Sequence, residues 1–172
     1  MPPELLIRII ADIAVFPVVL IGAYALLFKI PKGQRFQAYC RILLAGLTAY
    51  MLAKFVATIY QPSDMRPFEL LGVEAGAAFL NNPGFPSDHA LFVTAITAAV
   101  WFETRMKKTT LLLIGLVLAV CIGRVLALVH TPLDVIGGVV IALVGALWYL
   151  QKPITMHAVE KRGQHGKSNH RR

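Results

Sequence analysis

The sequence predicts an all-α protein, a bundle of about five helices that crosses a membrane. Composition is the first observation: 57% of the 172 residues are hydrophobic and only 15% are charged, whereas soluble domains contain about 25% charged residues. The second is that the apolar residues fall in runs near the ~20 residues that a membrane-spanning helix needs. The third is that basic residues gather between these runs and after the last of them.

Five segments are predicted to span the membrane, namely residues 5–28, 42–60, 90–102, 111–129 and 132–150. The third is short, and reaches a spanning length if its helix begins near Ser87. The apolar stretch 70–80 is too short to cross and is interpreted as an interfacial or re-entrant segment. No long polar or Gly/Ser-rich tract separates these elements. We therefore expect one transmembrane domain over residues 1–150 and a basic tail over residues 151–172.

The basic residues predict which side of the membrane each helix end faces. They cluster between the first and second helices, between the third and fourth, and in the tail, as Lys29, Lys32, Arg35, Arg41, Arg105, Lys107, Lys108, Lys152, Lys161, Arg162, Lys167, Arg171 and Arg172. With five spans these regions share one side, and the positive-inside rule assigns that side to the cytoplasm. The positive-inside rule thus accounts for the net charge of +8, and binding to nucleic acid is not needed to explain it. The tail is expected to be solvated and disordered by default, and can touch anionic lipid.

The remaining polar side chains are predicted to converge on the opposite, outer face. They comprise Lys54, Arg66, His89, Arg124, His130 and Asp134, together with the long loop 61–88. Two further charges, Arg8 and Asp12, lie four residues apart inside the first apolar run, and we expect them to form an intramembrane ion pair. The outer face is therefore the candidate functional site.

Two helix starts in this region carry histidines. In "GFPSDHA", Ser87 suits an N-cap, and the backbone N–H groups that follow it are free to bind an anion. In "HTPLD", Thr131 suits an N-cap, Pro132 the first helical position and Asp134 the third. His130 then lies just outside its helix, close enough for Asp134 to accept its ring N–H. A histidine oriented in this way presents its other nitrogen as a nucleophile or base.

The surrounding cations indicate phosphoryl chemistry. Arg124, Arg66 and Lys54 can stabilise the oxygens of a multiply charged phosphoryl group, and His89 can protonate a leaving oxygen. No carboxylate cluster or Cys/His ligand set is present in the sequence, so neither a metal nor another cofactor is required. Taken singly, each signal has a plainer interpretation: His130–Asp134 as a capped helix start, and Arg124 or Lys54 as an interfacial anchor.

These motifs resemble those of the type 2 phosphatidic acid phosphatase (PAP2) superfamily. "GRVLALVHTPLD" matches its third signature, Arg-x5-His-x3-Asp. "PSDH" resembles the second signature, usually Pro-Ser-Gly-His, and Arg66–Pro67 resembles the end of the first, Lys-x6-Arg-Pro. The resemblance covers residues 54–138, with the motifs in family order.

The resemblance implies a role for each matching residue. His130 would form a phosphohistidine intermediate, Asp134 would orient it, and His89 would act as general acid and then help to activate water. Phosphate would be bound by the remaining matching residues, which are Arg66, Arg124 and the backbone of Ser87 and Asp88.

Three features depart from the family pattern. Lys54 precedes Arg66 by 12 residues rather than seven, so either the loop is longer or Lys54 is not the equivalent residue. Asp88 replaces the usual glycine, as in the bacterial undecaprenyl-diphosphate phosphatases of this superfamily. The third departure is the helix count, because the family commonly has six spans.

The resemblance predicts a lipid phosphatase of the bacterial plasma membrane, with its site on the outer side. The best specific hypothesis is hydrolysis of undecaprenyl diphosphate to undecaprenyl phosphate. Phosphatidylglycerophosphate and phosphatidic acid remain alternative substrates. A transporter or proton-conducting protein is the alternative from another class, because intramembrane His and Asp often mark such paths. A catalytically inert lipid-binding relative is the third hypothesis.

Overall fold

The structure is a computed structural model that describes residues 3–63, 65–80 and 84–151. All regular elements in these ranges are helical: α1 (Pro3–Arg8), the π-helical turn η1 (Ile9–Ile13), α2 (Val15–Phe28), the 3-10 turn η2 (Lys32–Gln34), α3 (Arg35–Ile59), α4 (Pro67–Leu71), α5 (Asp88–Thr104), α6 (Lys107–Leu126), α7 (Pro132–Gly145) and the 3-10 turn η3 (Ala146–Leu150). The predicted all-α class is confirmed. Most of the predicted basic tail, residues 152–172, lies outside the described residues.

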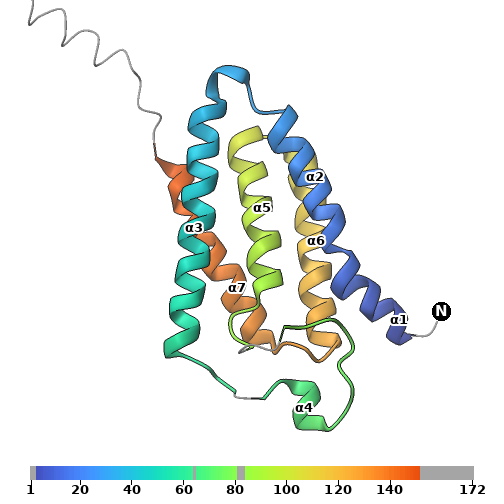
Figure 1. The fold of residues 1–172 in the computed structure, drawn as a ribbon. Helices are drawn as coiled ribbons and strands as arrows, with labels where there is room; N and C mark the ends of the chain where they lie inside the picture. The colour runs from blue at the N-terminus through green and yellow to red at the C-terminus, as the bar shows by residue number, and fades with distance from the viewer. Residues whose placement is uncertain (1–2, 64, 81–83, 152–172) are drawn as a thin grey trace, which may run out of the picture.

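Helix α5 is the centre of the bundle (Figure 1). It packs against α2, α3, α6 and α7, and its Ala90, Val93 and Val100 are fully buried. Large apolar side chains, by contrast, lie exposed on the outside of the surrounding helices, as at Leu20 and Leu111. A buried core of small and β-branched residues with an apolar exterior is what a bundle surrounded by lipid requires.

Within the described ranges, four helical segments are long and apolar enough to cross a membrane: Pro3–Phe28, Lys32–Ile59, Lys107–Leu126 and Pro132–Leu150. The fifth long helix, α5, has 17 residues and runs among the others (Figure 1). It begins directly after Ser87, as predicted. The chain is thus a multi-pass membrane protein built as a helical bundle.

Helix α3 begins earlier than predicted, at Arg35 rather than at residue 42. Arg35 and Arg41 therefore belong to the helix and not to the loop before it. Arg41 forms a two-pronged pair with Glu103 near the end of α5, with both N···O distances at 2.7 Å. The apolar run alone predicted too short a helix for α3, because an arginine that is paired or near a helix end need not interrupt a helix.

Small residues allow α7 to approach its neighbours closely. A Cβ at Gly138 would lie 2.5 Å from the carbonyl oxygen of Ser87, and one at Gly145 would lie 2.5 Å from that of Ala45. Ala142 in α7 and Ala146 at the start of η3, which continue the stripe from Gly138, are also buried. Small residues at such positions let helix backbones come together in membrane proteins. Through Gly138, the start of α5 is held against the first turns of α7.

The long loop between α3 and α5 covers the end of the bundle where α5 and α7 begin and α6 ends (Figure 1). Phe68 N donates to Leu128 O, and Gly76 N donates to Ala127 O, both at 3.0 Å. Leu128 has a φ of 57°, so the α6–α7 turn is tight where the loop binds it. The stretch predicted as interfacial or re-entrant contains the end of α4 and irregular chain, and its placement in a membrane stays a prediction.

Candidate active site

A small cavity of about 40 Å³ lies at this covered end of the bundle, lined by Arg66, Leu80, Pro86, Asp88, His89, Arg124 and His130. These residues come from the long loop, the start of α5, the end of α6 and the α6–α7 turn. The predicted convergence of polar residues is therefore found in the structure. Segments as far apart as residues 66 and 130 line the same small cavity.

His130 is held beside Asp134 by the start of α7. Thr131 is the N-cap: its hydroxyl accepts a hydrogen bond from Asp134 N at 3.2 Å, while Asp134 Oδ2 accepts one from Thr131 N at 2.7 Å. Such reciprocal bonds form a capping box. His130 Nδ1 lies 3.6 Å from Asp134 Oδ2, which is longer than a hydrogen bond. Asp134 thus lies beside His130 as predicted, but the two side chains are too far apart for a hydrogen bond.

Burial sets the charge of His130. Its ring is 5% exposed, and desolvation lowers its pKa, with Arg124 and Arg66 acting in the same direction. Asp134 opposes this shift without reversing it. The imidazole is therefore neutral at physiological pH, and because Nδ1 faces Asp134, Nε2 is the nitrogen free to react.

Arg66 is fixed by backbone carbonyls. Its Nη1 donates to Val129 O at 2.5 Å and its Nη2 to Leu80 O at 3.1 Å. The guanidinium also lies over the ring of Phe79, 5.3 Å from the centroid. Its own backbone N donates to Glu69 Oε2 at 2.6 Å, which anchors the start of α4. The cation thus keeps its charge while the long loop holds it at the cavity wall.

Arg124, in the last turn of α6, is 1% exposed. Its Nη1 donates to Asp12 Oδ1 at 3.0 Å and to Ala78 O at 2.7 Å. The predicted Arg8–Asp12 ion pair is wrong, since the ion pair recorded for Asp12 is with Arg124. The reason is tertiary: η1 passes so close to α6 that a Cβ on Gly123 would lie 2.8 Å from Ala11 N.

Ser87 occupies the predicted N-cap position of α5. Its side chain makes no capping bond there, and among the described residues its buried Oγ has no hydrogen-bond partner. Its backbone N donates to Asp134 O at 2.9 Å. This bond joins the first turns of α5 and α7, and so His89 and His130 reach the same cavity.

Lys54 lies at the rim of the cavity and not among the residues that line it. Its Nζ is 2.9 and 3.1 Å from the two carboxylate oxygens of Asp88, and 5.3 Å from the ring centroid of Tyr50. Both members of the pair are partly exposed. Lys54 is thus connected to the cavity through Asp88, and its role as a phosphate ligand stays a prediction.

Sequence reasoning missed two kinds of contributor to the site. The first is Asp12, which was visible as a charge but assigned to the wrong partner because only neighbours in sequence could be compared. The second is the set of carbonyls at Ala78, Leu80 and Val129 that hold the two guanidiniums. Every residue has a carbonyl, so no sequence signal marks these three. In the described ranges, no three His, Cys, Asp or Glu side chains gather as a metal site would require.

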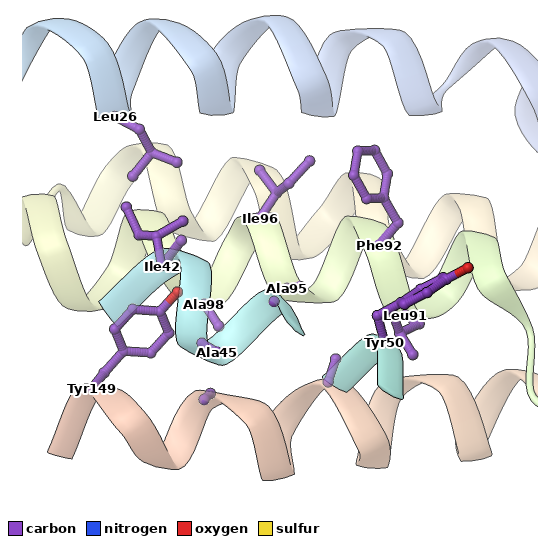
Figure 2. Close-up of a pocket in the computed structure, with 14 residues that line it drawn as sticks. Leu26, Ile42, Ala45, Tyr50, Leu91, Phe92, Ala95, Ile96, Ala98 and Tyr149 are labelled. Carbon is purple, nitrogen blue, oxygen red and sulfur yellow. The ribbon is translucent and has the colours of Figure 1, made fainter. Parts of the chain in front are cut away.

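A larger apolar groove of about 290 Å³ runs along α5 between α2 and α3. Figure 2 shows Tyr50, Leu91 and Phe92 at one end of it and Leu26, Ile42 and Tyr149 at the other. The groove lies where α2 and α3 both pack on α5 and meet each other through a hydrogen bond from Tyr39 Oη to Leu26 O at 3.3 Å. At its Tyr50 end it comes close to Lys54, which pairs with Asp88 at the cavity.

Comparison with known proteins identifies the family. The PAP2 superfamily model matches residues 38–156, a range that includes every cavity residue. The chain belongs to the PAP2 superfamily. The undecaprenyl-diphosphatase BcrC of Bacillus subtilis (strain 168) is 31% identical over 129 residues, which cover 72% of this chain and 64% of the relative. The match thus spans less than two thirds of that relative's length. No solved structure matches the chain.

Membership of the PAP2 superfamily confirms the resemblance carried by the three motifs. The matched range begins within α3 and leaves α1, η1 and α2 outside it. Asp12, which contacts Arg124, is therefore supplied by a part of this chain that the PAP2 model does not cover.

Proposed function

We propose that the protein is an integral-membrane lipid phosphatase that transfers a phosphoryl group to water through a phosphohistidine intermediate. One observation carries the proposal: two histidines and two arginines line one small cavity at the end of an apolar bundle. Fixed cations stabilise developing charge on phosphoryl oxygens, and a buried neutral imidazole is a competent nucleophile.

In the first step, Nε2 of His130 attacks phosphorus and the bond from phosphorus to the leaving oxygen breaks. Burial, with Arg124 and His130 acting in the same direction, lowers the pKa of His89 to about 4, so His89 takes up a proton as the anionic phosphate binds beside it. It then donates this proton to the leaving oxygen, and the dephosphorylated lipid leaves with one negative charge fewer than it would otherwise carry. Asp134 stabilises the positive charge that develops on the His130 ring. Arg66, Arg124 and the backbone N–H of Asp88 bind the phosphoryl oxygens. The Ser87 N–H, which the sequence also suggested for this role, is already donated to Asp134 O.

In the second step, His89, now neutral, takes a proton from water as the water oxygen attacks phosphorus. The bond between phosphorus and Nε2 breaks, which releases inorganic phosphate and returns His130 to its neutral form. No metal ion or other cofactor enters either step. We assign Lys54 an accessory role at the rim, where it can move from Asp88 to a second phosphate group.

We propose an isoprenoid diphosphate as substrate, with undecaprenyl diphosphate converted to undecaprenyl phosphate. Asp88 in place of glycine and the similarity to BcrC, named as an undecaprenyl-diphosphatase, support this choice. The apolar groove between α2 and α3 (Figure 2) is suited to part of a lipid chain, and its end near Lys54 leads to the cavity. Phosphatidylglycerophosphate and phosphatidic acid are the alternative substrates.

We place the protein in a bacterial plasma membrane with its site on the outer side and the tail in the cytoplasm. The basic residues Lys29, Lys32, Arg105, Lys107 and Lys108 lie at the end of the bundle opposite to the cavity (Figure 1). By the positive-inside rule that end is cytoplasmic. Protease accessibility of the loop between α3 and α5 in sealed vesicles tests this orientation.

The decisive experiment compares phosphate release by wild type and His130→Ala, both purified in detergent, from undecaprenyl diphosphate, phosphatidylglycerophosphate and phosphatidic acid. Each assay is run both with and without EDTA. Leu133→Ala is the matched control, because Leu133 is exposed and does not line the cavity. We expect His130→Ala to lose at least about 10³-fold in kcat and the control to lose little.

Each part of the proposal can fail separately. Activity that survives in His130→Ala contradicts the phosphohistidine mechanism. Loss of wild-type activity with EDTA contradicts a metal-free site. Phosphate release from phosphatidic acid alone contradicts the undecaprenyl assignment.

A further inference from the structure

The carboxylate of Asp12 belongs to the N-terminal segment but reaches the cavity end of α6. Asp12 Oδ1 lies 3.0 Å from Arg124 Nη1, and Asp12 Oδ2 accepts a hydrogen bond from Ala78 N at 3.0 Å. Ala78 O accepts from the same Nη1 at 2.7 Å. Three segments that are far apart in sequence are thus joined by a closed set of three hydrogen bonds around one guanidinium.

Two local features bring Asp12 to this position. In η1, Ala14 N donates to Ile9 O, five residues back, at 3.2 Å, so this turn is wider than an α-helical turn. On the facing helix, the absence of a side chain at Gly123 lets Ala11 come within contact of α6. Asp12, the next residue along, therefore lies beside Arg124, the residue after Gly123.

The hydrogen bonds of Arg124 show which of its nitrogen donors the contact with Asp12 leaves unused. Nη1 is engaged by Asp12 and Ala78, whereas Nε is buried and has no hydrogen-bond partner among the residues described. A buried donor without a partner is costly to the fold. Arg124 lines the cavity together with His89 and His130, so the donors of its guanidinium that Asp12 and Ala78 leave unused are available to an anionic oxygen bound there.

We propose that Asp12 is a positioning residue that orients Arg124 toward the transferring phosphoryl group. The inference rests on the proposed phosphatase function. Asp12 holds one nitrogen of the guanidinium and thereby presents another to the site. A donor that is already oriented needs no reorganisation when charge develops on the phosphoryl oxygens, so the contribution of Asp12 falls mainly on kcat. Asp12 does not raise the affinity for the substrate, because its negative charge repels the negatively charged phosphate.

The test uses full-length protein and compares Asp12→Asn with Glu4→Gln. Asp12→Asn removes the charge at nearly constant shape, and Glu4→Gln removes an exposed carboxylate from the same N-terminal segment. For the best lipid phosphate, we expect Asp12→Asn to lower kcat about 10- to 100-fold with KM unchanged or lower. Glu4→Gln should stay within about twofold of wild type. Asp12→Glu should recover part of the lost kcat.

A double mutant separates positioning from a general effect on the fold. In an Arg124→Lys background, Asp12→Asn should lower kcat by less than about threefold, because the guanidinium that it positions is gone. An equal loss in both backgrounds overturns the inference. So does a wild-type kcat in Asp12→Asn, and in that case the phosphatase proposal stands.

Orthovanadate, which mimics a five-coordinate phosphoryl group, gives a readout without turnover. Its Kd, measured by stabilisation against thermal unfolding, should rise about tenfold in Asp12→Asn. If wild type hydrolyses no lipid phosphate, the proposed function fails. An unchanged Kd for orthovanadate in Asp12→Asn then overturns the positioning role as well. A raised Kd shows instead that Asp12 orients Arg124 in a site that binds anions.

Discussion

The two ends of the bundle each hold an arginine paired with a carboxylate, and the two pairs differ in how completely they satisfy each other. At the end away from the cavity, Arg41 donates from Nε and Nη2 to both oxygens of Glu103. At the cavity end, Arg124 meets Asp12 through Nη1 alone, and its Nε stays without a partner in the described residues. A bidentate pair is complete in itself, whereas a single contact leaves donors for another ligand. We infer from this difference that the first pair supports the fold, whereas the second pair is suited to the phosphate-binding role proposed for Arg124.

Removing each arginine gives the largest expected contrast between the two ends. Arg124→Gln should lower kcat about 10²- to 10³-fold, because a preorganised donor to the phosphoryl oxygens is lost. Arg41→Gln should leave kcat within about threefold but reduce the free energy of unfolding by about 3 kcal/mol, since it leaves the buried Glu103 unpaired. Phosphate release and thermal unfolding of the purified variants measure both effects. Loss of activity in Arg41→Gln without loss of stability would remove the distinction between the two ends.

The dependence of activity on pH tests the burial of His130 at the cavity end. Burial lowers the pKa of His130 from its ordinary value of 6.5, so the neutral, nucleophilic form persists to more acidic pH than for a solvated histidine. Activity should therefore be retained as pH falls to 6.5 and be lost, up to tenfold per pH unit, only below it. The acid limb of kcat/KM against pH measures this. A midpoint above 7 would contradict it.

The pair between Lys54 and Asp88 lies at the rim, is partly exposed and should give the smallest effect. Exposed ion pairs contribute little to stability, so Lys54→Met should leave thermal unfolding nearly unchanged. If Lys54 binds the second phosphate of a diphosphate, KM for undecaprenyl diphosphate should rise up to about tenfold while kcat stays the same. Phosphatidic acid, with one phosphate, is the control substrate. An equal rise in KM for both lipids would contradict a diphosphate-specific role.

Most of the site could be predicted because its strongest signals are local. The capping box of Thr131 and Asp134 spans four residues, so the sequence alone predicts that Asp134 lies beside His130. The same holds for Ser87 at the start of α5. The Asp12–Arg124 contact could not be predicted, because it joins residues 112 positions apart and depends on the width of η1 and on Gly123.

By itself, the sequence determined the helical class, the apolar segments, the helix starts that carry the two histidines and the family. Hydrophobic runs and capping residues act over one helix length or less, so these features can be read along the chain. Only the tertiary structure decided which carboxylate holds Arg124, which carbonyls hold Arg66, and that Lys54 lies at the rim beside Asp88. These contacts depend on how closely helices pack and where the long loop crosses them, which is settled by the shapes of surfaces distant in sequence.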